Sequence, residues 1–378
     1  MKIIVLGAGL VGSPMAVDLA KDKNMKISVA DISEHNLAKF NNNPAITTIC
    51  QDLSDRALLS DLVKGFDMAV SAVPGFMGYQ TLETIIETGT DVIDIAFFPE
   101  DAFTLDELAQ KNGVTAVVDC GVAPGMSNML VAYGNSMLEK TTEAEIYVGG
   151  LPETRTLPWE YKAVFSPVDV IEEYIRPAFY VRDGKIIEKP ALSEPELIDF
   201  PVVGTLEAFN TDGLRSLIKT MDIPNMKEKT MRYPGHIEKI RLLRDNGFFS
   251  KKPVKVNNHE IRPIDLAAKL LFPSWELKKG QADITIMRVE VKGEKHGRKA
   301  SYTWDLFDRY DVETKIHSMA RTTGYTATAV LRLIREGLFS RRGIIAPEFI
   351  GQDRLCMEFI MNELKKRRVI YKQTSSSE

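Results

Sequence analysis

The stretch Ile3-Ile4-Val5-Leu6-Gly7-Ala8-Gly9-Leu10-Val11-Gly12 places an apolar run directly before a GxGxxG pattern. The apolar run is typical of a buried strand, and a helix is expected to begin at the last glycine. In such a turn Gly7 permits the tight bend, Gly9 lets the backbone approach a pyrophosphate, and Gly12 lets the helix pack closely on the strand. The N–H groups of the loop and helix start, around Leu10 and Val11, then attract phosphates. This stretch therefore predicts a dinucleotide-binding βαβ unit.

An acidic residue stands where the ribose of a dinucleotide would lie. Asp31 ends the second expected strand, 19 positions after Gly12, and an acid there accepts hydrogen bonds from both ribose hydroxyls. The next residue is Ile32, and neither Ser33 nor Glu34 offers a cation to a 2′-phosphate. Asp31 would also repel such a phosphate, so the sequence favours NAD over NADP. As an alternative Asp31 caps the following helix, although Ser33 is the better-placed cap.

Two later segments extend the expected cofactor site. Asp52 follows the third strand and is expected to contact the adenine side of the cofactor, or else to serve as a surface turn residue. The segment Ser71-Ala72-Val73-Pro74 ends the fourth strand. Ligands of open parallel sheets bind at this carboxyl edge, so its backbone is expected to line the cofactor crevice.

The first third of the chain alternates short apolar runs with helical spacing, which predicts βαβ units and a parallel, doubly wound Rossmann sheet. The expected strands are 3–6, 27–30, 45–49, 68–71, 92–95 and 114–118. After Gly121 strand-like runs and hairpin signals dominate, which predicts an inserted α+β domain with a mixed or antiparallel sheet. A phase slip in the apolar alternation suggests a bulge near Met287 and Arg288.

The expected domains are a Rossmann NAD-binding domain (1–122), an α+β substrate and dimerisation domain (123–317), and C-terminal helices that return to the Rossmann domain (318–378). The last residues, with KKRR followed shortly by TSSSE, are expected to form a frayed tail.

Composition excludes several classes of protein. The 378 residues carry a net charge of −4, which gives no field for gathering nucleic acid or an anionic membrane. The three cysteines have no CxxC spacing, which argues against a disulfide scaffold or a cysteine-built metal site. No metal motif, long apolar span or signal peptide is apparent. We therefore expect a soluble, cytoplasmic, multi-domain α/β or α+β protein that uses no metal and binds neither nucleic acid nor membrane.

Several further segments resemble one family. The run from Val118 to Asn128, VDCGVAPGMSN, resembles the D/E-x-G-x-x-P-G turn of the saccharopine dehydrogenase-like family. Further similar segments are YVGGLP (147–152), EAF (207–209), TMRYPGH (230–236) and ARTTGYTA (320–327). Within that family, the length and these segments are most similar to the L-lysine 6-dehydrogenases.

The resemblance implies a Rossmann domain with an inserted domain that shapes the substrate site and carries a homodimer or larger homo-oligomer interface. It implies oxidative deamination of L-lysine at the ε-carbon with NAD, giving 2-aminoadipate 6-semialdehyde, which cyclises to piperideine-6-carboxylate. Relatives of the saccharopine and carboxynorspermidine dehydrogenase type, which reduce imines, offer an alternative reaction. A non-catalytic NAD-binding regulator is an alternative of another class.

Four polar residues are candidates for the catalytic chemistry. Asp94 and Asp119 end the fifth and sixth strands, where either carboxylate could accept the amine proton or simply cap a turn. His236 stands in the TMRYPGH segment as a site or structural residue, and Arg232 as a carboxylate clamp or a surface ion pair.

Two more candidates lie in the inserted domain. Asp212 begins a predicted helix and is a site residue or only its N-cap. Tyr161, together with Trp159, is expected either to wall the lysine methylenes or to pack between domains.

Overall fold

The computed structural model describes residues 1–278 and 280–377, and the chain divides into two compact units. The first unit contains Met1–Ser136 and Ala320–Ile370, and the second contains Met137–Met319 and the segment from Tyr371 onward. The boundary expected after residue 122 thus lies after residue 136, because helix α6 (Met126–Ser136) belongs to the first unit. The C-terminal helices do return to the first unit, but the segment after Ile370 does not.

The sheet of the first unit is parallel throughout, which confirms the predicted Rossmann fold. Its strand order is β17-β6-β5-β4-β1-β2-β3. Their bounds are β1 (Lys2–Leu6), β2 (Lys26–Asp31), β3 (Ile46–Cys50), β4 (Met68–Ser71), β5 (Asp91–Asp94), β6 (Thr115–Val117) and β17 (Gly343–Ile345). Because β4 and β2 flank β1 on opposite sides, the loop after β1 opens at the switch point of the sheet, where ligands bind.

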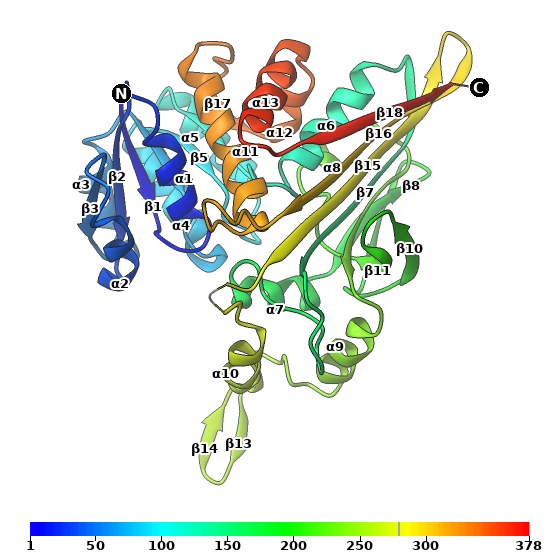
Figure 1. Ribbon diagram of the computed structural model, residues 1–378, viewed down its shortest axis with the longest axis horizontal. Coiled ribbons are helices and arrows are strands. Elements are labelled where there is room, and N and C mark those ends of the chain that lie inside the picture. The colour runs from blue at the N-terminus through cyan, green and yellow to red at the C-terminus, as the bar shows by residue number, and fades with distance from the viewer. Residues whose placement is uncertain (279, 378) are drawn as a thin grey trace. The chain divides into compact units, whose positions relative to one another are not determined.

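Helices connect and cover these strands (Figure 1). Besides α6 they are α1 (Gly12–Leu19), α2 (Glu34–Leu37), α3 (Arg56–Val63), α4 (Gly75–Glu87), α5 (Asp106–Lys111), α11 (Ser318–Arg335), α12 (Pro347–Gly351) and α13 (Arg354–Lys366), with short 3₁₀ turns at Ala38–Phe40 and Ala102–Leu105. Asp18 of α1 is 1% exposed and lies 2.8 Å from both Arg332 of α11 and Arg367 after α13. This buried ion cluster fastens the late helices to the first helix of the same unit.

The second unit is built on a separate mixed sheet, as predicted. The main strand order is β10-β11-β12-β7-β15-β16-β18. The β12–β7 pair is parallel and the other pairs are antiparallel. The bounds are β7 (Lys140–Pro152), β8 (Ala178–Arg182), β9 (Lys185–Lys189), β10 (Glu196–Phe200), β11 (Gly204–Asn210), β12 (Met226–Arg232), β15 (Asp283–Lys295), β16 (Arg298–Arg309) and β18 (Tyr371–Ser377), with a small β13 (Val254–Val256) and β14 (His259–Ile261) hairpin.

Two sequence expectations are wrong in this sheet. The expected frayed tail forms β18, which pairs with β16 from Leu306 to Ala300 and runs beside it in Figure 1. No bulge occurs at Met287 and Arg288; the register shifts instead between Lys292 and Gly293. The apolar phase slip arises because residues 283–287 are all buried, so that both faces of β15 are covered there.

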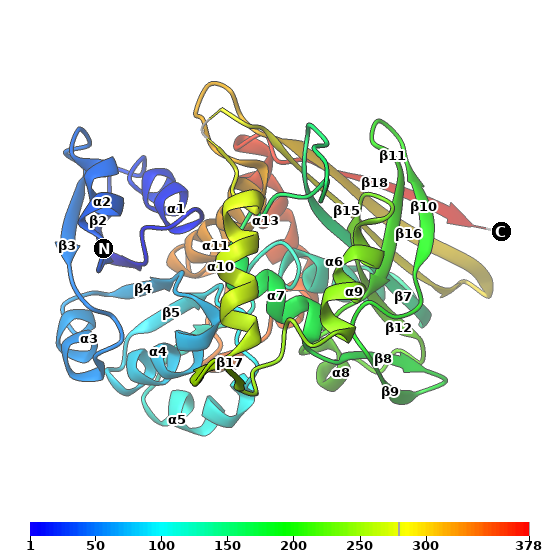
Figure 2. The ribbon, with the colours of Figure 1, turned by 90° about the horizontal axis from the view of Figure 1, so that it is seen from below.

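One aromatic core of the second unit joins three helices: α7 (Pro167–Ile175), α9 (His236–Asp245) and α10 (Pro263–Trp275). Among the described residues, the short helix α8 (Leu217–Thr220) contributes no side chain to this core. Figure 2 shows α7 between α9 and α10, and side chains of all three meet around Trp275, which is 0% exposed.

Within the described residues, no helix has the length and apolarity needed to cross a membrane.

Candidate functional site

The glycine loop after β1 has the shape that the sequence predicts. Gly7 has a φ of +100°, and a Cβ there would lie 2.7 Å from the carbonyl oxygen of Ala72. A Cβ on Gly12 would collide with the carbonyl oxygen of Gly7, whereas a Cβ on Gly9 would meet no atom within 4 Å. Gly7 and Gly12 are therefore required by the fold itself, while Gly9 leaves a cradle that a side chain would fill.

Asp31 is anchored beside this loop by two backbone groups. Its carboxylate accepts hydrogen bonds from the Ala8 N–H and the Ser33 N–H, each at 2.7 Å. Ile32, which follows it, is 65% exposed. The anchored carboxylate and the open side of Gly9 together fit the ribose and pyrophosphate of a dinucleotide.

Lys39 is a residue near the loop that the sequence reading missed. Its Nζ donates to the Ala8 carbonyl at 3.3 Å. Burial lowers the pKa of Lys39, and the neighbouring Asp31 carboxylate opposes that shift. Only the fold of the segment after β2 brings this lysine back to the loop, so no local motif marks it.

The other predicted cofactor residues are of two kinds: the segment at the end of β4, and the exposed Asp52 after β3. Ser71 ends β4 and is 0% exposed, and its hydroxyl has no hydrogen-bond partner among the described residues. Val73 is nearly buried, and Pro74 is the N-cap of α4. Asp52 is exposed and accepts hydrogen bonds from the Ser54 N–H and hydroxyl, which lower its pKa. The turn role foreseen for Asp52 is thus present, and a contact with adenine stays a prediction.

Asp94 and Asp119 lie at the carboxyl edges of neighbouring strands in the first unit. Asp94 is 0% and Asp119 8% exposed, and the Cys120 N–H donates to the Asp94 carbonyl at 2.9 Å. Asp119 has a φ of +49°, an unusual conformation of the kind that collects at functional sites. Burial and the two carboxylates raise the pKa of Cys120, so its thiol stays protonated and is unsuited to nucleophilic attack.

In the second unit, Arg232 lies at the centre of a buried polar cluster. It is 2% exposed, and its guanidinium lies 2.8 Å from Glu173 and donates to the Tyr174 hydroxyl at 3.3 Å. The guanidinium also lies 4.7 Å from the centre of the Tyr161 ring. Arg232 therefore forms a buried ion pair in place of the surface pair considered as its alternative.

His236 begins α9 and belongs to the same cluster. Its Nε2 lies 3.0 Å from the Tyr174 hydroxyl and its Nδ1 3.1 Å from the Trp159 carbonyl. Burial, assisted by the charge of Arg232, lowers the pKa of His236 to about 3. The imidazole is neutral near pH 7, and both ring nitrogens have protein partners, which suits a positioning role.

The cluster extends to a carboxyl group that the sequence did not single out. Glu173 accepts from Thr230 at 3.0 Å, the Thr230 and Thr211 hydroxyls lie 2.8 Å apart, and Thr211 donates to Glu228 at 2.7 Å. Burial raises the pKa of Glu228 to about 8. The available signal was the alternation of Glu228, Thr230 and Arg232 along β12, which places them on one face.

Asp212 lies at the margin of this extension. Its carboxylate is 3.7 Å from Arg215, and its charge contributes to the raised pKa of Glu228. Thus the structure brings Tyr161, Arg232 and His236 into one cluster of the second unit. It brings Asp94 and Asp119 together in the first unit.

Glu228→Gln should alter how stability depends on pH. A carboxyl whose pKa rises from 4.5 to about 8 on folding binds more protons when folded. Its contribution is therefore complete below pH 4.5 and is lost as the pH rises through 8. Between these limits wild type should lose up to about 1.4 kcal/mol per pH unit relative to Glu228→Gln. Urea unfolding followed by tryptophan fluorescence measures this difference, with the exposed Glu260→Gln as control; parallel wild-type and Glu228→Gln profiles would contradict it.

Comparison with known proteins places this geometry in context. A family model described as the saccharopine dehydrogenase NADP binding domain matches residues 3–117. A second, described as the saccharopine dehydrogenase C-terminal domain, matches residues 121–370. Together they cover nearly the whole chain.

Curated relatives are distant. Mitochondrial alpha-aminoadipic semialdehyde synthase of Mus musculus is 24% identical over 70% of this chain, and the match spans only 30% of that protein's length. The NADP(+), L-glutamate-forming saccharopine dehydrogenase of Schizosaccharomyces pombe is 22% identical over 91% of this chain and 93% of that protein. The solved apo saccharopine dehydrogenase (L-Glu forming) from Saccharomyces cerevisiae matches with a TM-score of 0.81 at 19% identity, covering 99% of each chain. At this identity the structural match concerns the fold.

Proposed function

Because this chain belongs to the saccharopine dehydrogenase family, we propose that it is an NAD-dependent oxidoreductase that acts on a C–N bond of an amino acid. The substrate proposed is L-lysine, oxidised at the ε-carbon. With water and NAD⁺ it yields 2-aminoadipate 6-semialdehyde, ammonium, NADH and a proton, and the semialdehyde cyclises to piperideine-6-carboxylate. The observation that carries the choice of NAD is the Asp31 carboxylate, held by two backbone N–H groups beside the glycine loop.

The residues of the chain have distinct roles in this proposal. Gly9 and the start of α1 would hold the pyrophosphate and Asp31 the adenosine ribose. Bound NAD⁺ supplies the hydride acceptor. Asp94 or Asp119 would take the proton from the amine before hydride leaves, because a protonated amine has no lone pair to stabilise the developing imine. The Arg232 cluster would fix the shape of the second unit.

A second candidate is the reaction for which the relatives are named: oxidation of saccharopine with NADP, or the reverse reaction. Those relatives include saccharopine dehydrogenases of the NADP(+), L-glutamate-forming type. Initial rates with L-lysine, saccharopine and a polyamine, each with NAD and NADP, separate the candidates. Lysine-dependent reduction of NAD is expected. Saccharopine turnover without lysine turnover would favour the second candidate, and nucleotide binding without any turnover a non-catalytic regulator.

Asp31→Ala should reduce the preference for NAD over NADP. Hydrogen bonds to a charged acceptor contribute about 1.5–3 kcal/mol each, so the ratio of NAD to NADP affinity should fall at least about tenfold. Loss of the carboxylate also frees the Ala8 and Ser33 N–H groups, which should lower the affinity for both nucleotides. The ratio of the two affinities is therefore the informative quantity. Calorimetric titration of both cofactors measures it, with Asp61→Ala on the exposed face of α3 as control. An unchanged ratio would remove Asp31 from nucleotide selection.

A further inference from the structure

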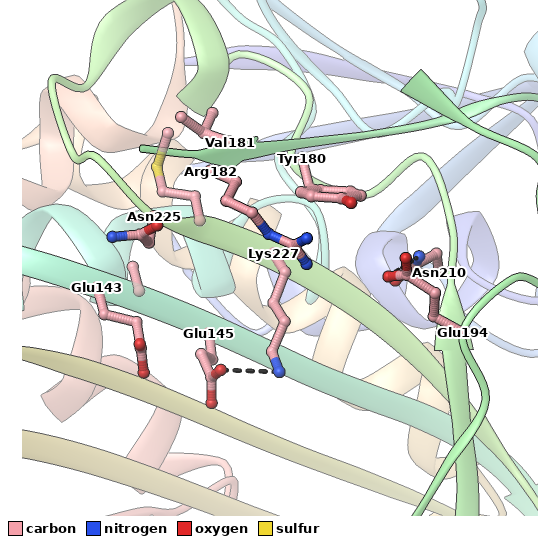
Figure 3. Close-up of a pocket in the computed structure, with 11 residues that line it drawn as sticks. Glu143, Glu145, Tyr180, Val181, Arg182, Glu194, Asn210, Asn225 and Lys227 are labelled. Atoms are coloured by element: carbon pink, nitrogen blue, oxygen red, sulfur yellow. Dashed lines mark hydrogen bonds and ion pairs between the residues drawn. The ribbon is translucent and has the colours of Figure 1, made fainter. Parts of the chain in front are cut away.

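A pocket of about 190 Å³ lies wholly within the second unit. Its walls come from the start of β7, from β8, from the end of β11, from the start of β12 and from two loop residues. Figure 3 shows Arg182 and Tyr180 of β8 in the middle, with Glu143 on one side and Glu194 on the other. Glu143, Glu145, Glu194, Arg182 and Lys227 contribute charges of both signs.

One wall of the pocket contains a buried polar atom with no partner. Tyr180 is 6% exposed, and its hydroxyl has no hydrogen-bond partner among the described residues. A buried hydroxyl without a partner is disfavoured by about 1–3 kcal/mol, and a ligand oxygen brought within reach by a small rotation of the Tyr180 side chain would remove that penalty. The unpartnered hydroxyl is therefore a second feature of the pocket, besides its charged side chains.

Arg182 completes a pair with this phenol. It follows Tyr180 by two positions on β8, so both side chains leave the same face of the strand, and its guanidinium lies 5.2 Å from the Tyr180 ring centre. Lys227, in contrast, lies 2.8 Å from Glu145. A guanidinium beside a phenolic O–H can bind a carboxylate through a charge-assisted fork and one further hydrogen bond.

The carboxylates of the pocket could bind a positively charged group of the same ligand. Glu143 and Glu194 pair with Lys292 and Lys189, in ion pairs whose side chains are about 36–40% exposed. Ion pairs this exposed are weak, so an incoming ammonium can share their carboxylates. We propose that this pocket binds a small α-amino acid as its zwitterion, with the carboxylate at Arg182 and Tyr180 and the ammonium at one of these two glutamates, which flank Arg182 in Figure 3.

Direct binding to the full chain without nucleotide tests this site. The probes are L-alanine and L-glutamate, neither of which is the proposed substrate, followed by ligand-observed NMR titration. At least one should bind, and propionate and ethylamine, which each lack one charge of alanine, should bind at least about tenfold more weakly than alanine if alanine is the ligand.

Three variants make the result decisive. Arg182→Ala and Tyr180→Phe should each lower the affinity for the amino acid at least about fivefold. Tyr180→Phe removes only the hydroxyl and keeps the ring. Arg298→Ala, an exposed arginine of the β15–β16 hairpin, should leave binding unchanged. Absence of binding to wild type, or equal affinities in all three variants, overturns the proposal. Neither outcome bears on lysine oxidation, which is measured with nucleotide present.

Discussion

Gly9→Ala should abolish most nucleotide binding while the protein folds normally. A Cβ at this position meets no protein atom within 4 Å, and Gly9 is not among the glycines with positive φ, so alanine is tolerated by the free chain. The same methyl group would occupy the space in which the pyrophosphate approaches the backbone. We expect an affinity loss of about 100-fold, or about 2.7 kcal/mol.

Calorimetric titration with NAD measures the loss, and thermal unfolding verifies the fold. Gly65→Ala is the matched control in the same unit, since its added Cβ would be 3.7 Å from the nearest heavy atom, the Leu62 carbonyl oxygen. Gly12→Ala should instead lower stability, because the Cβ collides with the Gly7 carbonyl. If Gly9→Ala binds NAD as tightly as Gly65→Ala does, the cofactor does not approach this loop as proposed.

Arg232→Ala should destabilise the second unit by about 3–5 kcal/mol, because it leaves the Glu173 carboxylate without its cation in a buried site. The ion pair is 2.8 Å long, and the side chains of Arg232 and Glu173 are 3% and 19% exposed. The double variant Arg232→Met/Glu173→Gln removes both charges and should recover much of the loss, since paired replacement of a buried ion pair is often close to neutral.

The protein carries its own probe for this measurement. It has three tryptophans, and Trp159, Trp275 and Trp304 all lie in the second unit, so urea unfolding followed by tryptophan fluorescence reports on that unit. Arg288→Ala is the control: Arg288 and Asp305 form a bidentate pair at 2.7 and 3.0 Å, but they are 27% and 37% exposed. Its loss should be below about 1 kcal/mol. If Arg232→Ala and Arg288→Ala lower the free energy of unfolding equally, burial does not make the Arg232 ion pair more important than an exposed one.

Local sequence was sufficient for the nucleotide loop. The spacing of Gly7, Gly9 and Gly12 after an apolar strand predicts close backbone packing at this loop. In the structure a Cβ on Gly7 or Gly12 would indeed collide with a neighbouring carbonyl oxygen. Asp31 was equally readable, because its hydrogen bonds go to Ala8 and Ser33, groups fixed by the same βαβ unit.

The Arg232 cluster was only partly predictable. Arg232 and His236 stand in one short segment, but their partners Glu173 and Tyr174 come from α7, about 60 residues earlier. Which side chain meets Arg232 depends on the packing of α7 against the sheet, and no local periodicity encodes that packing. Strand β17 was missed for a related reason: three residues that begin with Gly343 and end shortly before Pro347 carry too little pattern, and their strand character comes from pairing with β6.

The division of the chain has a consequence for biosynthesis. The polypeptide passes between its two units after Ser136, after Met319 and after Ile370. When the first 136 residues leave the ribosome, the outer edge of β6 has no partner strand, because β17 is made more than 200 residues later. An unpaired strand edge invites wrong pairing between nascent chains. Expression yield should therefore depend on chaperone supply during translation, and separate expression of residues 1–136 should give aggregated protein.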